Sequence, residues 1–172
     1  METFEAPKRP HIPFNGPERL QLDAWLDFYR ATLLEKCDGL NTEQLKDRPV
    51  ASSRLSLLGI VRHMTFVEQV WFESTFAGRN TTEYYKTEGD RDADFNDLDD
   101  TAVENVFVLY GQATDVSRDL AAGHDLGEMA AKARRGREVD LRWILIHMIE
   151  EYARHCGHAD LIRELIDGAT GY

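Results

Sequence analysis

Residues 141–168 read LRWILIHMIEEYARHCGHADLIRELIDG, and the pattern of this stretch decides the fold. An α-helix turns by about 100° per residue, so Ile144, Met148 and Ile162 lie within about 40° of one another and mark one apolar face. Gly168 follows the last apolar residue of the pattern, as is common just after the end of a helix. The stretch therefore predicts a long amphipathic helix with one side turned toward a core.

Three further segments, found by working outward from this helix, show the same kind of pattern. Each carries apolar residues three or four positions apart, whereas β-branched residues are scattered and alternation with a period of two is absent. Ser56 is a candidate N-cap, and Asn41 with Gln44 forms a capping-box pattern for a short extra helical turn. The four long segments span about 17–37, 56–76, 98–122 and 140–166. The sequence predicts an all-α fold, a four-helix bundle in which sites are built from side chains on facing helices.

Two parts of the chain are predicted to lie outside these helices. Residues 1–16 form an extended arm, because proline disfavours helix at Pro7, Pro10, Pro13 and Pro17. Residues 79–97 form a polar connection that contains six acidic residues. A connection of this length is either an ordered excursion over a site or a mobile crossover.

Composition limits the classes of protein to which the chain can belong. It has 172 residues, a formal net charge of −11 and 42% hydrophobic residues. This length and apolar fraction predict a single globular domain over residues 1–172. The charge argues against a nucleic-acid partner and against binding to an anionic membrane. No apolar run approaches the roughly 20 residues that span a bilayer, and no secretory signal is present. Two cysteines, Cys37 and Cys156, are too few for a disulfide scaffold, so a cytoplasmic protein is predicted.

Two residues of the 140–166 helix carry the chemical signal. Glu151 and His155 project onto its apolar face four positions apart, so their side chains can reach a common point. A carboxylate on a core-facing stripe is costly unless it is paired or binds a ligand. Glu151 could instead form a buried ion pair with Arg62 or Arg142, and His155 could be a core histidine. The pattern alone leaves both interpretations open.

A third residue completes a candidate metal site. His63, in LLGIVRHMTFVEQVWF, lies at the edge of the apolar stripe of its own segment. If the two segments face each other, His63, Glu151 and His155 form a set of two imidazoles and one carboxylate with an open coordination position, as in catalytic sites. These ligands suit Zn²⁺, and also Fe²⁺, Ni²⁺ or Co²⁺. His147 and His158 lie on the shoulder of the same face, about 60° from its centre.

At these residues the sequence resembles the DinB/YfiT-like metalloenzymes, and within them an actinobacterial branch of mini-circle-type proteins of unknown function. The resemblance covers about residues 18–171 and is most specific in the 141–168 stretch. The family fold is a four-helix bundle around one metal, which many members bind with one histidine of the second helix and an H-x3-H pair on the fourth. His63 and His155 match this pattern, and Glu151 stands in place of the first histidine of the pair. The mycothiol-dependent maleylpyruvate isomerase, which shares the fold, has a similar His, Glu, His site.

The resemblance implies a metal held by His63, Glu151 and His155, and no ligand role for His147 and His158. It also implies a low-molecular-weight thiol, such as mycothiol or bacillithiol, used by an S-transferase or isomerase on a small-molecule substrate. A metal with an open position would favour the thiolate, and His158 or His147 would handle the proton as candidate catalytic residues.

The basic stretch KARRGRE, residues 132–138, directly precedes the fourth helix. It could overhang the site, so candidate cofactor-binding residues are Arg134, Arg135 and Arg137. It could equally be a solvated linker that offsets some of the acidic surface. The arm could pack on a partner, which would make a homodimer. The alternative to an enzyme is a non-enzymatic metal- or ligand-binding stress-response module.

Overall fold

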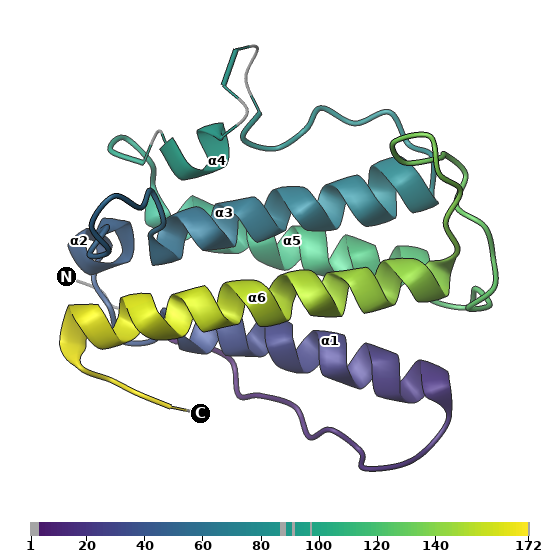
Figure 1. Cartoon of the computed structure of the whole chain (residues 1–172), viewed down its shortest axis with the longest axis horizontal. Helices are drawn as coiled ribbons and strands as arrows, with labels where there is room; N and C mark the ends of the chain where they lie inside the picture. Colours follow the sequence, from purple (N-terminus) through teal and green to yellow (C-terminus); the bar gives the residue numbers. More distant parts are fainter. Residues whose placement is uncertain (1–3, 87–88, 91, 97, 172) are drawn as a thin grey trace.

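The computed structural model describes residues 4–86, 89–90, 92–96 and 98–171, and four long helices dominate it (Figure 1). They are α1 (Glu18–Glu35), α3 (Leu57–Glu68) with its π-helical continuation η1 (Gln69–Phe76), α5 (Val103–Ala121) and α6 (Leu141–Asp167). Two short helices lie in the connections between the long ones: α2 (Thr42–Lys46) between α1 and α3, and α4 (Ala93–Asn96) between η1 and α5. Among the described residues there is no strand, only two isolated β-bridges. The all-α prediction is confirmed.

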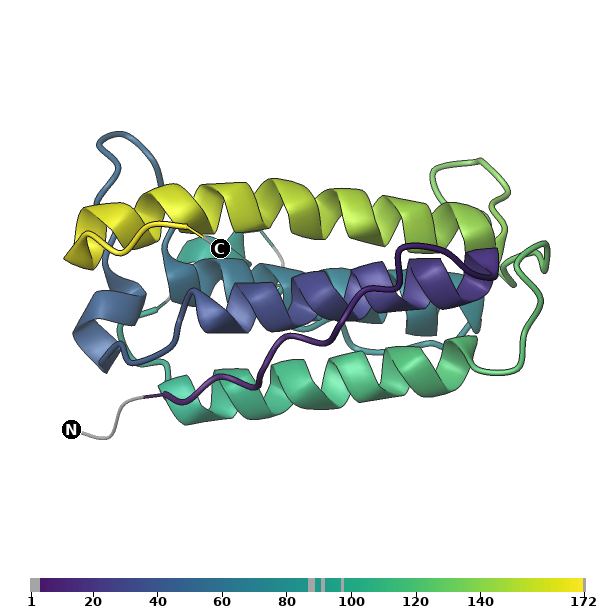
Figure 2. The ribbon, with the colours of Figure 1, turned by 90° about the horizontal axis from the view of Figure 1, so that it is seen from below.

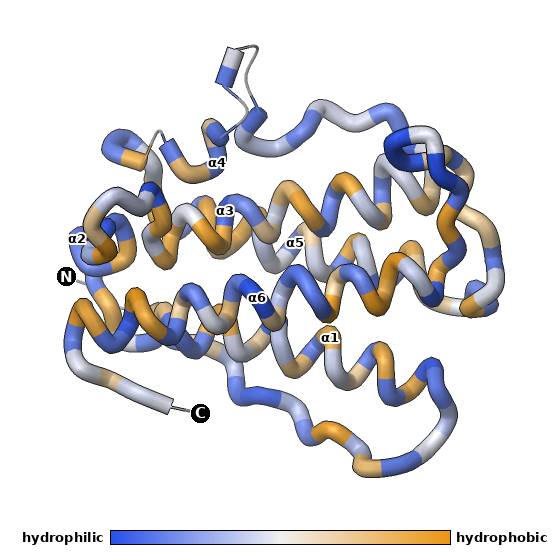
Figure 3. The backbone as a smooth tube through the Cα atoms, viewed as in Figure 1, coloured by the Kyte–Doolittle hydropathy of each residue, from blue (hydrophilic) through white to orange (hydrophobic). Residues whose placement is uncertain are grey.

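Local signals in the sequence define the helix ends. The Ser56 side chain accepts a hydrogen bond from a backbone N–H of the first turn of α3, and Asn41 with Gln44 forms a complete capping box at α2. Asp140 caps α6 in the same way, and Gly168 ends α6 in the left-handed conformation with φ 77°. Each long helix carries both hydrophobic and hydrophilic residues along its length (Figure 3). The hydrophobic sides meet in one core that includes Leu33, Ile60, Val106, Ile144 and Met148.

Two helical segments differ from the sequence prediction. The third long helix begins at Val103 rather than near residue 98, and Leu98 is buried in the core ahead of it. The second segment is not a continuous α-helix, since Gln69–Phe76 is a π-helix. The Gln69 side chain donates to the carbonyl of Thr82 at 3.1 Å and accepts from the N–H of Tyr84 at 2.9 Å. It therefore ties the polar connection to η1.

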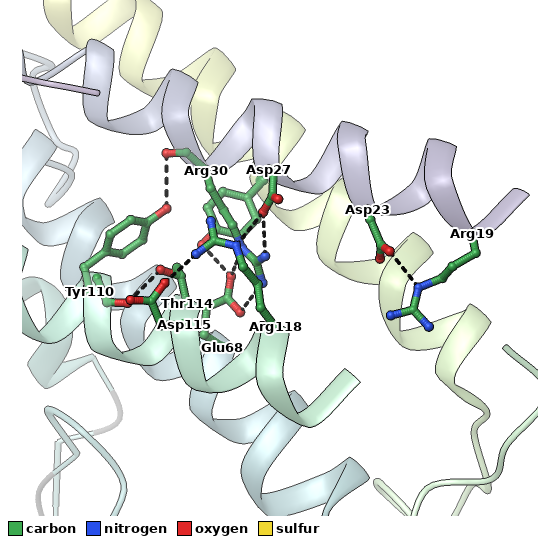
Figure 4. Close-up of polar contacts among 11 residues, drawn as sticks. Arg19, Asp23, Asp27, Arg30, Glu68, Tyr110, Thr114, Asp115 and Arg118 are labelled. Atoms are coloured by element: carbon green, nitrogen blue, oxygen red, sulfur yellow. Dashed lines mark hydrogen bonds and ion pairs between the residues drawn. The ribbon is translucent and has the colours of Figure 1, made fainter. Parts of the chain in front are cut away.

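A charged cluster that the sequence analysis did not identify lies inside the bundle (Figure 4). Arg30 of α1 donates to both carboxylate oxygens of Glu68 at 2.8 and 2.7 Å, and the Tyr152 hydroxyl of α6 donates to Glu68 at 2.7 Å. Glu68 is fully buried, and Arg30 is 4% exposed. Burial alone would lower the pKa of Arg30, but the adjacent Glu68 carboxylate outweighs it and raises that pKa. The Tyr110 hydroxyl of α5 donates to the backbone carbonyl of Arg30 at 3.2 Å, so the cluster joins all four long helices.

The N-terminal arm packs on its own chain. Residues 4–17 contain no helix and run across α1 and α5 (Figure 2). Phe4 stacks on Phe107 of α5 with ring centroids 3.8 Å apart, and Arg9 pairs with Glu35 at 2.6 Å. A homodimer formed through the arm would have to extend or replace these contacts.

The connection between α5 and α6 is pinned to the end of η1. The N–H of Ala131 donates to the carbonyl of Phe76 at 2.9 Å, and the N–H of Lys132 donates to that of Thr75 at 3.1 Å. Gly78 allows this approach, because a Cβ there would lie 2.8 Å from the Cβ of Ala131. This contact holds residues 132–138 close to the face shared by η1 and α6. Separately, no helix among the described residues has both the length and the apolar character needed to span a membrane.

Candidate metal centre

The predicted ligand set comes together between α3 and α6. His63, Glu151 and His155 each offer a donor atom, and these three atoms lie within 4.8 Å of one another. The rings of His63 and His155 have centroids 4.8 Å apart, and Nε2 of His155 lies 3.7 Å from Oε2 of Glu151. A single cation placed among the three groups is therefore compatible with the side-chain positions.

His63 is oriented by a carboxylate from α4. Its Nδ1 lies 2.7 Å from Oδ2 of Asp94, and the Phe95 ring stacks on its imidazole at 5.0 Å. With Nδ1–H donated to Asp94, Nε2 keeps its lone pair for a metal, as in the carboxylate–histidine–metal arrangements of many metal sites. Burial would raise the pKa of Asp94, but the hydrogen bond and charge of His63, with Lys86 3.7 Å away, lower it.

His155 is suited to act as a neutral ligand. Its side chain is largely buried, and this burial, together with the neighbouring His63 and His158, lowers its pKa to about 3. A neutral imidazole is the form that binds metals. Its Nδ1 is buried and has no hydrogen-bond partner among the described residues, which is unusual for a buried polar atom. Two imidazoles, one carboxylate and an unsatisfied nitrogen fit a divalent transition metal.

The arginines considered as partners for Glu151 have other contacts. Arg142 pairs with Glu18 at 2.7 Å, and Arg62 donates to the carbonyl of Ala93 at 3.0 Å and lies over the Tyr85 ring at 4.4 Å. The neighbours recorded for Glu151 are the histidines His147 and His155, at 3.5 and 3.7 Å.

The two histidines assigned to proton transfer lie in different surroundings. His147 stacks on Trp143 with centroids 5.0 Å apart and meets Trp71 edge-on at 4.6 Å. His147 also forms a second potential ligand group, with Glu150 and Glu151. His158 lies beside His155, with ring centroids 5.3 Å apart, and its buried Nδ1 has no hydrogen-bond partner in the part of the chain that the structure describes. Only His147 of the two lines the cavity described next.

A cavity of about 620 Å³ opens above the candidate ligands. Two of those ligands, His63 and Glu151, form part of its wall. Its other lining residues are Phe66, Val67, Val70, Trp71, Arg134, Arg135, Arg137, Glu138, Val139, Trp143 and His147. The basic stretch before α6 therefore borders the cavity.

The two thiols of the chain lie outside this site. Cys37 is fully buried, and Cys156 points to the backbone carbonyl of Tyr29 on α1, with Sγ 3.7 Å from the oxygen. Burial raises the pKa of each thiol to about 12. Neither has the thiolate character of a nucleophile.

Sequence reasoning missed Asp94. It was one of six acidic residues in a connection without periodicity, and no spacing rule pointed to it. The available signal was its position between Ala93 and Phe95, two apolar residues inside a polar run. These residues form the short helix α4, which packs on α3 and turns Asp94 inward.

The four long helices and the candidate ligands on two facing helices agree with the fold expected from the resemblance to the DinB/YfiT-like superfamily. A family model described as mycothiol-S-transferase (MST) matches residues 21–168, so the chain belongs to this family and, through it, to that superfamily. No curated protein matches the chain.

Proposed function

We propose that the protein is a metal-dependent mycothiol S-transferase whose divalent metal is held by His63, Glu151 and His155. The observation that carries the metal is the convergence of these three donors within 4.8 Å at the wall of an open cavity. Zinc is the metal we favour, because it suits nitrogen and oxygen donors with an open position, and the same donors accept nickel, iron or cobalt. The thiol follows from the family. We place the enzyme in the cytoplasm.

The ion, when bound, would favour the thiolate form of a coordinated thiol and so lower the thiol pKa. The remaining tasks fall to side chains of the chain. Nε2 of His147, 3.5 Å from Oε1 of Glu151, is positioned to accept the thiol proton at the cavity wall. His158 lies outside the cavity, and its ring would help to hold the imidazole of His155 in position. Trp71 and Trp143 give this cavity an aromatic wall.

The test is conjugation of mycothiol to a general electrophile. With 1-chloro-2,4-dinitrobenzene, the thiolate forms a C–S bond and chloride leaves with its electron pair. Protein purified without a tag or added metal should contain about one equivalent of metal by plasma mass spectrometry and should speed formation of the adduct. Chelation should remove both properties, and zinc should restore them. A rate no faster than the spontaneous reaction, with metal present, would favour the non-enzymatic module.

We predict that Asp94→Asn weakens metal binding by about 10–100-fold, the usual effect of losing a carboxylate that orients a ligating histidine. The affinity would be measured by competition with a chromophoric chelator. Asp92→Asn, in the same loop and exposed, is the matched control and should bind metal as the parent does. An unchanged affinity in Asp94→Asn would show that the contact with His63 does not serve the metal.

A further inference from the structure

Three arginines at the cavity differ from every other arginine that the structure describes. Each of the others has an oxygen partner within hydrogen-bond or ion-pair distance, on a carboxylate, a side-chain amide or a backbone carbonyl. Within the described part of the chain, the guanidinium groups of Arg134, Arg135 and Arg137 have no such partner. Unpaired guanidinium groups that border one cavity are suited to bind a carboxylate or a similar anion.

A tight hairpin holds these arginines in place. Arg134 and Arg137 exchange two backbone hydrogen bonds of 2.9 and 3.0 Å. The two residues between them, Arg135 and Gly136, have φ of 51° and 74°, as a type I′ turn requires. The backbone is thus ordered in advance, which reduces the entropy lost when a ligand binds.

Apolar and aromatic side chains form much of the remaining cavity wall. Trp71 and Trp143 pack with ring centroids 5.2 Å apart, and the Arg134 guanidinium lies 5.7 Å from the centroid of Trp71. Phe66, Val67 and Val139 extend this surface. A flat apolar group can stack on the indoles while an acidic substituent reaches the arginines.

The charge balance of the cavity favours an anion. Against three arginines stand two acidic residues, Glu138 and the candidate ligand Glu151. Glu83, Asp90 and Asp92 border a neighbouring cavity that also touches Arg134 and Arg135. None of these carboxylates pairs with the arginines, so the positive charge stays available in a protein of net charge −11.

We infer that the cavity selects an acceptor substrate with a flat, apolar body and a carboxylate, which Arg134, Arg135 and Arg137 bind while the body lies on Trp71 and Trp143. This inference rests on the proposed transferase function for the role of the bound molecule. It changes the predicted role of the arginines from holding the thiol cofactor to choosing its reaction partner.

Binding can be tested without any reaction. The chain has three tryptophans, so ¹⁵N-correlated NMR spectra of the holoprotein should show three indole N–H signals, with Trp25 on α1 as an internal reference. 4-Methylbenzoate should shift the signals of Trp71 and Trp143, whereas the uncharged 4-methylbenzamide should bind at least about tenfold more weakly. Equal binding of the two compounds, or shifts of Trp25 alone, would overturn the inference.

Variants identify the groups that bind the anion. Arg134→Gln, Arg135→Gln and Arg137→Gln combined should weaken 4-methylbenzoate binding at least about tenfold, the loss expected for charge-assisted hydrogen bonds. Each single variant should give part of this loss. Lys8→Gln removes one positive charge from the arm and should bind as the parent does. A triple variant that binds 4-methylbenzoate normally would contradict the role of the arginines.

Turnover separates this inference from the proposed function. Mycothiol thiolate displaces bromide from 4-(bromomethyl)benzoate or from its amide, with formation of a C–S bond. The ratio of kcat/KM for the acid over the amide should exceed one in the parent and fall about tenfold in the triple variant. Anion-dependent NMR binding without catalysed turnover would refute the transferase and keep the carboxylate site. Catalysed turnover with equal use of acid and amide would keep the transferase and refute the carboxylate site.

Discussion

Glu151→Ala should purify as a folded protein that retains no metal and has no conjugation activity. The variant removes one of the three donors proposed to hold the metal, so the loss of affinity should exceed the roughly 10–100-fold expected for a supporting hydrogen bond. Glu151 is partly exposed and pairs with histidines rather than with a buried cation, so its removal should change stability little. Metal content by plasma mass spectrometry and a thermal melt of the same sample give the two measurements.

Glu164→Ala is the matched control, because Glu164 lies on the exposed side of the same helix. It should retain about one equivalent of metal. His155→Ala should repeat the loss seen for Glu151→Ala. If Glu151→Ala kept a full equivalent of metal, the ligand assignment would be wrong.

Glu68→Ala should destabilise the fold by about 3–5 kcal/mol, a large fraction of the total stability of a domain of this size. The change leaves the buried guanidinium of Arg30 with only Asp27, at 2.9 Å and at the edge of the cluster, as an anionic partner. The Tyr152 hydroxyl loses its acceptor as well. Urea unfolding followed by circular dichroism would give the difference in free energy.

A double variant separates the cost of a stranded charge from the value of the ion pair. Arg30→Met with Glu68→Leu removes both charges and replaces them with apolar volume, so it should be more stable than Glu68→Ala. A loss below about 1 kcal/mol in Glu68→Ala would mean that water or another group compensates Arg30 after the substitution.

Periodicity and caps were sufficient to predict the bundle, because they depend on neighbours within one turn. Ser56, Asn41 and Gly168 act locally and were correctly assigned. The ion pair of Arg30 with Glu68 was not predictable, since it joins residues 38 positions apart and single-helix patterns carry no information about such pairs. The π-helix was missed for the same reason, because the contacts of Gln69 lie in a loop without periodicity.

Some parts of the candidate site could be predicted from one helix, and others depend on contacts between distant segments. The spacing of Glu151 and His155 is a property of one helix and could be derived from the sequence. Adding His63 required the assumption that α3 faces α6, and the structure brings these residues together. Asp94 and the orientation of the arginine hairpin depend on how two loops fold over the bundle. Residue spacing within a helix does not predict how such loops fold.

The hydrogen bond between His63 and Asp94 makes the imidazole a shared part of two assemblies. One is the set of candidate donors, and the other is the packing of α4 against α3. If a bound ion stabilises the packing of α4 on α3, thermodynamic linkage requires the reverse effect as well. The packed α4 then raises the affinity for the ion by the same free energy. The packing of α4 would then depend on whether the metal is bound. Substitutions in α4 that do not contact the metal would change the metal affinity.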